Sequence, residues 1–387
     1  MFNIKTLNKI SPSGLSRFDG AKYTYGDDIE NPDAIMVRSA KMHDMAFEDG
    51  LLAIGRAGAG VNNIPLDRCS ESGIVVFNTP GANANAVKEL VIAGMLICSR
   101  RVIPAIEWEK TLKGNGAEVA KMVEKGKSAF TGPELMGKTL GVIGLGAIGI
   151  GVANTAKSLG MEVYGYDPYL SVDAAWHLSR SIKHSSNLDE IFANCDYITV
   201  HVPLTDETRD MISAKTIAGM KDGVRILNFA RGDLVNTADI IAALSTGKVA
   251  AYVTDFPDNR IANATGVIAL PHLGASTPES EDNCASMAAG ELIDYLENGN
   301  IVNSVNMPAV SCHRTEGARI CVIHKNNPGM INKLSALFSS KNINIENMLN
   351  KSKKDYAYTV VDVDSRILRK GAVSAQKGER LLIPINM

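Results

Sequence analysis

The sequence predicts an α/β protein with two doubly wound parallel sheets in series, followed by a small α+β unit. Short apolar runs alternate with longer helical patterns, and the runs are continuous, as in strands that are buried on both faces. The alternation is interrupted by a polar stretch at 110–132, restarts, and gives way to a third unit after Gly317. A chain of 387 residues is long enough for two or three domains.

The first unit contains three predicted strands and one long helix. The strands are expected at 34–37, 51–54 and 73–77, where the residues are almost all apolar. The segment 85–102 is apolar and helix-permissive, and it ends at two arginines just before Pro104. We expect it to be a buried connecting helix.

The second unit has a longer series of strands with helical segments between most of them. Strands are predicted at 139–143, 161–166, 196–200, 224–228, 250–254 and 267–270. A second long helix is expected at 277–297, and the segment 303–308 that follows resembles a hinge. This β-α alternation predicts a parallel sheet with right-handed crossovers.

The third unit is a β-α-β module of about 70 residues. Residues 319–324 and 356–363 are predicted as strands, and 330–338 as an amphipathic helix. The final residues, 370–387, match a second helix and a last strand poorly.

Charge and cysteine content exclude several classes of protein. The formal net charge of −2 and the isoelectric point of about 6.4 argue against nucleic-acid and acidic-membrane partners. The apolar stretches are shorter than the roughly 18 residues of a membrane span. Six cysteines without a CxxC pair indicate a reducing compartment, and we expect a cytoplasmic protein. No metal site is predicted, because Cys312, His313, Cys321 and His324 lack paired-ligand spacing.

A glycine-rich motif predicts a dinucleotide site in the second unit. Gly144, Gly146 and Gly149 follow a predicted strand and open a helix at 147–159. Gly144 permits a tight turn, Gly146 lets the backbone approach a pyrophosphate, and Gly149 allows close packing of helix on sheet. Asp167 follows the next strand at the expected distance of about 20 residues, where a carboxylate binds the ribose hydroxyls and favours NAD over NADP.

Two residues are placed for hydride-transfer chemistry on a hydroxy acid. Arg231 and His272 each follow a predicted strand, where ligands of parallel sheets bind. A cation can hold a substrate carboxylate, and a histidine can accept the hydroxyl proton. His201 also ends a strand, but we expect it to line the cofactor site. Alternatively, His272 is an ordinary strand-end histidine and Arg231 a surface turn residue.

The motifs GLGAIG, HVPLT, NFARG and PHLGAST, in this order, resemble the D-2-hydroxyacid dehydrogenase family. The earlier segments IMVRSA, GRAGAGV and NTPGANANAVKEL resemble the members that act on a phosphorylated hydroxy acid. The resemblance implies two Rossmann-like lobes joined by crossing helices. One lobe is discontinuous and binds substrate (1–93 and 276–307), and the other binds NAD (94–275). It also implies a homo-oligomer and NAD-dependent interconversion of 3-phosphoglycerate and 3-phosphohydroxypyruvate, at the entry to L-serine synthesis.

The resemblance also implies roles for individual residues. His272 is the acid/base, and Arg231 grips the substrate carboxylate and polarises its C2–O bond. Other positions correspond to residues that bind the phosphorylated substrate: Arg38, Ser39, Ala59, Gly60 and Asn83. A larger set corresponds to residues that contact the cofactor: Gly144, Gly146, Ala147, Ile148, Gly149, Asp167, His201, Pro203, Thr208, Ala230, Asp255 and Gly274. Alternatively, the charge at Arg38 and Lys41 is that of a solvated loop.

One departure concerns the partner of His272. Members of the family carry a Glu shortly after the strand that contains the Asp, but residues 255–260 read DFPDNR. Asp258 is the nearest carboxylate and is the predicted partner, although a gapped alignment could place Asn259 or Arg260 there instead.

The third unit, at 317–387, resembles an ACT domain, a small amino-acid-sensing fold. The resemblance implies that L-serine binds as an effector at His324, Asn326 and Asn344, between paired domains. Alternatively, Pro328-Gly329 only starts a helix and the asparagines only form turns.

Two other functions stay open at this point. One is a dehydrogenase for a different small 2-hydroxy acid, and the other is an NAD-sensing regulatory scaffold. The presence of both Arg231 and His272 argues against the scaffold.

Overall fold

The computed structural model describes residues 1–387 except 263, 316, 365–379 and 385–387, and only the backbone of 380–384. The chain forms two compact units, Met1–Asn83 with Pro278–Met387, and Ala84–Thr277. The first boundary falls earlier than the predicted 93/94. The reason is that helix α3 (Ala84–Arg100) packs on α6, β10 and β11 of the second unit, burying Val87 and Val91.

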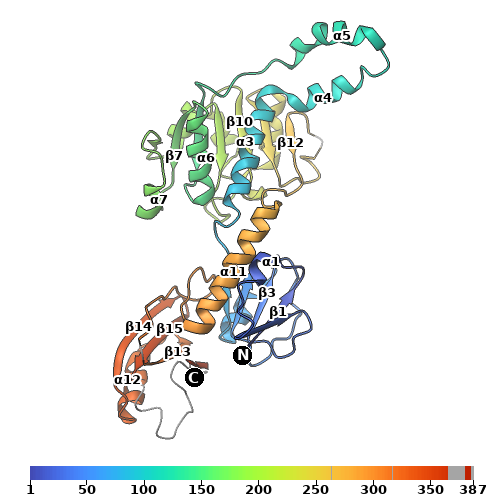
Figure 1. Ribbon diagram of the computed structural model, residues 1–387. Helices are drawn as coiled ribbons and strands as arrows, with labels where there is room; N and C mark the ends of the chain where they lie inside the picture. The colour runs from blue at the N-terminus through green and yellow to red at the C-terminus, as the bar shows by residue number, and fades with distance from the viewer. Residues whose placement is uncertain (263, 316, 365–379, 385–387) are drawn as a thin grey trace. The chain divides into compact units, whose positions relative to one another are not determined.

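A five-stranded parallel sheet in the order β2-β1-β3-β4-β5 forms the core of the first unit (Figure 1). Its strands are β1 (Phe2–Leu7), β2 (Tyr23–Gly26), β3 (Ala34–Val37), β4 (Ala53–Arg56) and β5 (Val75–Phe77). The sequence predicted β3, β4 and β5, but neither β1 nor β2. The helices that accompany this sheet are α1 (Pro12–Leu15), α2 (Leu66–Glu71) and α11 (Pro278–Asn298).

Helix α11 is the long helix expected at 277–297, and it packs on the first sheet against β3, β4 and β5. Its buried residues Ala285, Ala288, Leu292 and Leu296 recur at helical spacing and form one apolar stripe. Leu292 lies over Gly55 of β4, where an added Cβ would come within 2.9 Å of its side chain. The absence of a side chain at Gly55 therefore lets the helix approach the sheet closely.

The second unit is built on a seven-stranded parallel sheet in the order β12-β11-β10-β9-β6-β7-β8. Its strands are β6 (Thr139–Ile143), β7 (Glu162–Tyr166), β8 (Lys183–His184), β9 (Tyr197–Val200), β10 (Val224–Asn228), β11 (Val249–Thr254) and β12 (Val267–Ala269). β6 pairs with both β7 and β9, so the strand order reverses there. Ligands of doubly wound sheets bind at such a reversal, beyond the carboxyl ends of the strands.

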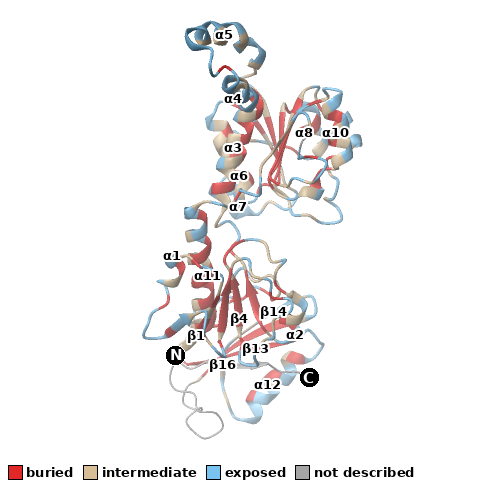
Figure 2. Ribbon diagram, turned by 90° about the vertical axis from the view of Figure 1, so that its right-hand side faces the viewer, coloured by how far each residue is buried: buried red, intermediate tan, exposed pale blue. Residues whose placement is uncertain are grey.

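Helices cover this second sheet, as its buried residues show (Figure 2). Besides α3 they are α6 (Ala147–Ser158), α8 (Leu188–Asn194), α9 (Ala214–Ala218) and α10 (Thr237–Ser245). The unit also contains a 3₁₀ turn, η3 (Gly232–Leu234), and helix α7 (Val172–Trp176), which has no buried residue. The polar stretch after α3 is also helical, in α4 (Val102–Lys110), η1 (Gly116–Glu118), α5 (Val119–Gly126) and η2 (Lys127–Phe130). Neither α4 nor α5 has a buried residue.

The third predicted unit contains a four-stranded sheet in the order β14-β15-β13-β16 and, among its described residues, one helix. Its elements are β13 (Ala318–Lys325), α12 (Met330–Ser340), β14 (Ile345–Lys353), β15 (Tyr356–Val363) and β16 (Arg380–Pro384). β15 pairs antiparallel with β13 and β14, whereas β16 pairs parallel with β13. Residues 365–379, on which the expected second helix largely falls, lie outside the described residues. None of the described helices is long and apolar enough to cross a bilayer.

Candidate active site

The glycine motif forms a tight turn from β6 into α6. Gly144 has a φ of +93°, and an added Cβ would lie 2.7 Å from the carbonyl oxygen of His201. At Gly149 an added Cβ would lie 1.9 Å from the carbonyl oxygen of Gly144. By contrast, no atom lies within 4 Å of an added Cβ at Gly146, at the N-cap of α6. Two glycines therefore allow close packing, and the third leaves room beside the helix N-terminus, where Ala147 and Ile148 begin the first turn.

Asp167 follows β7 and holds the glycine turn. Its Oδ2 accepts a hydrogen bond of 2.8 Å from the Leu145 backbone N–H, and its Oδ1 accepts one of 2.8 Å from that of Tyr169. The carboxylate is half-buried at the end of the strand next to the glycine turn. This position fits the ribose of a dinucleotide whose pyrophosphate occupies the space at Gly146.

His201 follows β9 and lies beside the same turn. Its Nε2 is 2.9 Å from Thr199 Oγ1, and its Nδ1 is buried without a hydrogen-bond partner among the described residues. Burial lowers the pKa of His201 to about 4, so the ring is neutral at pH 7. A neutral ring fits the prediction that His201 lines the cofactor site. Nearby, Thr208 Oγ1 donates to the Pro203 carbonyl oxygen at 2.7 Å and stabilises that loop.

Arg231, Asp255 and His272 follow three neighbouring strands, β10, β11 and β12. Arg231 is exposed, and its Nη1 donates to the Ala230 carbonyl oxygen at 2.6 Å. His272 is exposed too, with its ring 4.7 Å from that of Phe256. An exposed cation and an exposed imidazole at one edge of the sheet can bind a carboxylate and transfer a proton.

Asp255 is the buried member of this group, at 1% exposure. Its Oδ2 accepts a hydrogen bond of 3.2 Å from the Gly274 backbone N–H, whereas its Oδ1 has no partner among the described residues. Burial raises the pKa of the Asp255 carboxyl, and the nearby positive charges of His272 and Arg231 oppose that rise.

Asp258, the predicted partner of His272, is bonded to other groups in this structure. Asp258 Oδ1 accepts hydrogen bonds of 2.8 Å from the backbone N–H groups of Arg260 and Ile261. Its Oδ2 accepts one of 3.2 Å from Thr237 Oγ1 and forms an ion pair with Arg260. The carboxylate thus closes a turn after β11. Its role as the partner of His272 stays a prediction.

In the first unit, Arg38 and Ser39 follow β3. The Arg38 carbonyl oxygen accepts a hydrogen bond of 3.1 Å from Arg56 Nε, and the Ser39 N–H donates to Asn8 Oδ1 at 3.1 Å. Arg56 was not predicted as a site residue. It ends the neighbouring strand β4, as Arg38 follows β3, and that repeated placement is a signal in the sequence.

The loops at 58–60 and 78–83 contain the remaining predicted substrate residues. Asn78 Nδ2 donates to the Ala59 carbonyl oxygen at 2.6 Å, and the Thr79 N–H donates to the Gly58 carbonyl oxygen at 3.2 Å. Gly60 lies in the first loop, and the half-buried Asn83 ends the second. The structure therefore brings Arg38, Ser39, Ala59 and Gly60 to the carboxyl edge of one sheet. The loop that contains Asn83 is hydrogen-bonded to the loop at 58–60.

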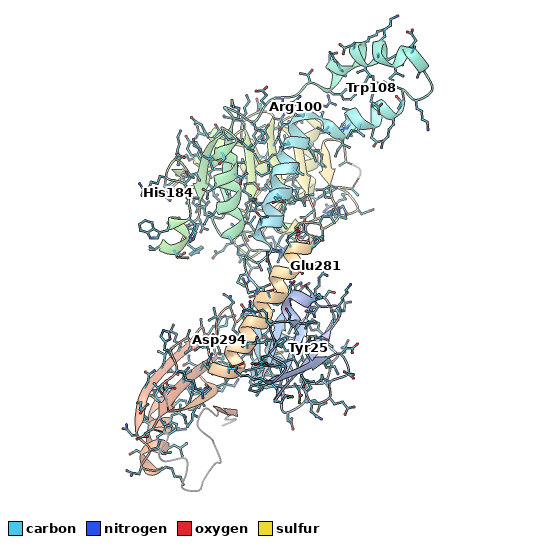
Figure 3. The ribbon with its side chains drawn as sticks, viewed as in Figure 1. Tyr25, Arg100, Trp108, His184, Glu281 and Asp294 are labelled. Carbon is cyan, nitrogen blue, oxygen red and sulfur yellow. The ribbon has the colours of Figure 1, made fainter. Side chains whose placement is uncertain are left out.

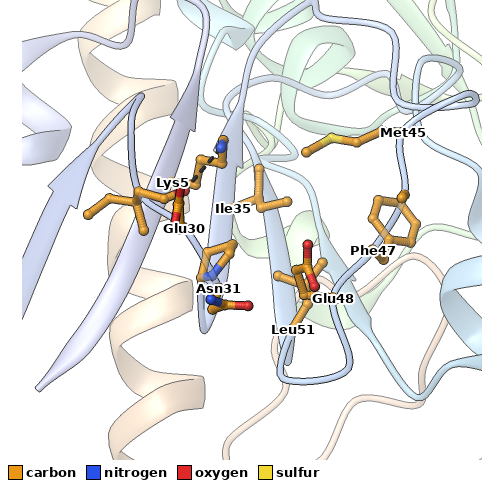
Figure 4. A pocket seen from close by; sticks show the side chains of 11 residues that line it. Lys5, Glu30, Asn31, Ile35, Met45, Phe47, Glu48 and Leu51 are labelled. Carbon is orange, nitrogen blue, oxygen red and sulfur yellow. Dashed lines mark hydrogen bonds between the residues drawn. The ribbon is translucent and has the colours of Figure 1, made fainter.

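A cavity of about 280 Å³ opens elsewhere in the first unit (Figure 4). It is lined by residues that precede β3 and β4, including Asn31, Pro32 and Phe47. None of the predicted substrate residues lines it. Because ligands of parallel sheets bind at the carboxyl ends of the strands, we do not assign this cavity to the reaction.

The predicted effector residues of the third unit do not share one environment. His324 is buried at 4% exposure, with Nδ1 2.8 Å from the Lys325 carbonyl oxygen and Nε2 3.0 Å from Thr359 Oγ1. Asn326 and Asn344 are exposed, and Asn326 Nδ2 donates to the Lys354 carbonyl oxygen. Both ring nitrogens of His324 therefore have partners within the chain, and serine binding at these residues stays a prediction.

Comparison with known proteins agrees with this geometry. Residues 92–274 match the family described as D-isomer specific 2-hydroxyacid dehydrogenase, NAD binding domain. D-3-phosphoglycerate dehydrogenase of Bacillus subtilis is 35% identical over 343 residues, which are 84% of this chain and 62% of that protein. The Haemophilus influenzae enzyme of the same name is 35% identical over 327 residues, covering 81% of this chain and 76% of that protein.

Solved structures of related dehydrogenases share the fold of this chain. An NAD⁺-bound 3-phosphoglycerate dehydrogenase of Entamoeba histolytica superposes with a TM-score of 0.59 at 26% identity, covering 79% of this chain and 98% of that chain. A glyoxylate reductase at 24% identity shares the fold with a TM-score of 0.63. The chain spans about half the length of several curated relatives, such as those of Archaeoglobus fulgidus and Synechocystis. The chain belongs to the D-3-phosphoglycerate dehydrogenases, within the D-isomer specific 2-hydroxyacid dehydrogenase family.

Proposed function

We propose that the protein is an NAD-dependent oxidoreductase that interconverts D-3-phosphoglycerate and 3-phosphohydroxypyruvate, at the entry to L-serine synthesis. The observation that carries this proposal is the placement of Arg231, Asp255 and His272 after adjacent strands of a sheet that also carries the glycine turn. The names of the relatives support the phosphorylated substrate.

The residues of the glycine turn fit the cofactor. The open space at Gly146 and the helix N-terminus would receive the pyrophosphate, and Asp167 would accept hydrogen bonds from the adenosine ribose. The negative charge of Asp167 disfavours a 2′-phosphate, which supports NAD over NADP. When bound, NAD supplies the hydride acceptor for oxidation of the hydroxy acid.

The remaining chemistry is assigned to side chains of this chain. Arg231 binds the substrate carboxylate and polarises the C2–O bond, because a guanidinium offers two parallel N–H donors to a carboxylate. His272 takes the hydroxyl proton during oxidation and returns it during reduction. We assign to Asp255 the stabilisation of the positive charge that His272 gains, because the two residues follow the adjacent strands β11 and β12.

The carboxyl edge of the first sheet supplies donors for the substrate phosphate. Arg38 and Arg56 provide positive charge there, and we assign the backbone N–H groups of Ala59 and Gly60 to the phosphate as well. We assign Ser39 and Asn83 to the same role as hydroxyl and amide donors.

A substrate panel tests the proposal. Initial rates of NADH oxidation are compared for 3-phosphohydroxypyruvate, hydroxypyruvate and glyoxylate. The proposal expects kcat/KM for the phosphorylated substrate to be higher by about tenfold or more, from one charge-assisted phosphate contact of at least 1.4 kcal/mol. Equal or higher kcat/KM with an unphosphorylated acid would identify a dehydrogenase for another small 2-hydroxy acid.

We also infer a homo-oligomer that responds to L-serine and lies in the cytoplasm. Exposed apolar residues on α4, namely Val102, Ile103 and Ile106, support self-association. The described cysteines are free, which fits a reducing compartment. Light scattering gives the oligomeric state, and a rate that stays constant across a serine titration would remove serine as an effector.

A further inference from the structure

The guanidinium of Arg38 is paired with a carboxylate at the start of α11. Arg38 Nη2 lies 2.6 Å from Glu281 Oε1, and the two side chains are 42% and 44% exposed. Glu281 is in the first turn of the helix, where Figure 3 labels it. The residue to which we assign the substrate phosphate therefore already binds an anion that belongs to the chain.

This pair is not needed to hold the neighbouring backbone. Arg56 Nε donates to the Arg38 carbonyl oxygen, and the backbone N–H groups of Ser39 and Ala40 both donate to Asn8 Oδ1. These bonds fix the segment after β3 without Glu281. The start of α11 is likewise fixed by the hydrogen bond from Ser11 Oγ to Asp282 Oδ1.

The ion pair with Glu281 instead occupies the guanidinium group of Arg38. A guanidinium binds a phosphate through parallel N–H groups, and a carboxylate uses the same donors in the same geometry. Two anions at one guanidinium also repel each other at this partly exposed edge. An arriving phosphate must therefore displace the Glu281 carboxylate or bind beside it at an electrostatic cost.

We propose that Glu281 is a specificity-determining residue that competes with the substrate phosphate for Arg38. The inference rests on the proposed function, because it takes Arg38 as the phosphate-binding residue. Substrates that lack a phosphate leave the ion pair intact, so Glu281 has little effect on their KM. Glu281 thus sets KM for the phosphorylated substrate without taking part in hydride transfer.

The substitution Glu281→Gln tests this proposal in the full-length protein. Gln keeps the size of the side chain and removes its charge. KM for 3-phosphohydroxypyruvate is expected to fall about three- to tenfold, the range of a partly exposed ion pair plus relief of repulsion. The value of kcat, and KM for hydroxypyruvate, should stay within about twofold, and the fall should shrink at high salt.

Two controls separate the ion pair from a general charge effect. Glu279→Gln removes a charge from the same helical turn, at a residue for which no ion pair is found among the described residues, and should leave KM unchanged. In an Arg38→Ala background, Glu281→Gln should no longer lower KM. The reason is that the guanidinium for which Glu281 and the phosphate compete is absent.

The outcomes distinguish this inference from the proposed function. A wild type that favours the phosphorylated substrate, with an unchanged or raised KM in Glu281→Gln, would overturn the inference alone. An equal fall in KM in Glu279→Gln, or in the Arg38→Ala background, would overturn it too. A wild type that does not use the phosphorylated substrate would overturn the proposed function and the inference with it.

Discussion

The guanidinium of Arg319 forms a bidentate ion pair with the carboxylate of Asp362, and neither side chain is more than 1% exposed. Arg319 also donates to the carbonyl oxygens of Asn298, Cys312 and His313, at 2.9, 3.2 and 2.8 Å. Asn298 is the last residue of α11, and the adjoining Gly299 carbonyl oxygen accepts a hydrogen bond from Tyr358 Oη. The third unit therefore holds the C-terminal end of α11.

Removal of Arg319 should be strongly destabilising. Arg319→Met leaves Asp362 buried without its counter-ion, and a broken buried pair costs about 3–5 kcal/mol. Urea unfolding followed by circular dichroism measures the loss. The double variant Arg319→Met/Asp362→Leu should recover much of it, because no unpaired charge remains. A single variant within about 1 kcal/mol of wild type would show that the pair contributes no more than a surface ion pair.

Glu291 should make stability depend on pH. Burial raises the pKa of its carboxyl to about 8, and the hydrogen bond from Asn303 Nδ2 to Oε1 only partly opposes this. In the unfolded chain the same carboxyl titrates near pH 4.5. Between pH 4.5 and about 8, Glu291 is therefore protonated in the folded state and ionised in the unfolded chain. The stability that this group contributes is complete below pH 4.5 and is lost as pH rises through about 8.

The substitution Glu291→Gln replaces the protonated carboxyl by a neutral amide. At pH 5 the variant and the wild type should have similar melting temperatures, and above pH 8 the variant should be the more stable. Thermal unfolding at the two pH values gives the comparison. A difference that does not change with pH would contradict a raised pKa.

Gly149 and Gly151 provide a matched pair in α6. An added Cβ at Gly149 would lie 1.9 Å from the Gly144 carbonyl oxygen, whereas at Gly151 its nearest neighbour would be Lys88 Cδ at 3.4 Å. Gly149→Ala should cost about 1–3 kcal/mol and displace the turn, so NADH binding should be lost. Gly151→Ala should gain up to about 1 kcal/mol from helix propensity. NADH fluorescence and thermal unfolding measure both effects, and normal NADH binding in Gly149→Ala would contradict the assigned role of the turn.

Much of the fold could be predicted because the inner strands are short and continuously apolar. The predicted strands at 139–143, 224–228 and 356–363 have the bounds found in β6, β10 and β15. β1 was missed because it alternates buried with partly buried residues and contains Lys5. β14 was missed because none of its residues is buried, so that only its pairing with β15 defines it.

In the candidate site, too, local patterns could be predicted from the sequence and long-range contacts could not. The turn at Gly144–Gly149 and the strand ends at Arg231 and His272 follow from local patterns. The partners of Asp258 depend on how the chain turns after β11, and a pattern of residue types does not contain that information. The pairing of Arg38 with Glu281 joins segments that are far apart in the sequence, and only the folded lobe brings them together.

We propose that His272 transfers the proton in an NAD-dependent reduction. The most direct test follows the loss of NADH absorbance with 3-phosphohydroxypyruvate for the wild type and for His272→Ala, with NADH binding measured in both. We expect the wild type to be active, kcat of the variant to fall about 10²- to 10⁴-fold, and NADH affinity to be unchanged. Full activity in the variant, or an inactive wild type that binds NADH, would contradict the account.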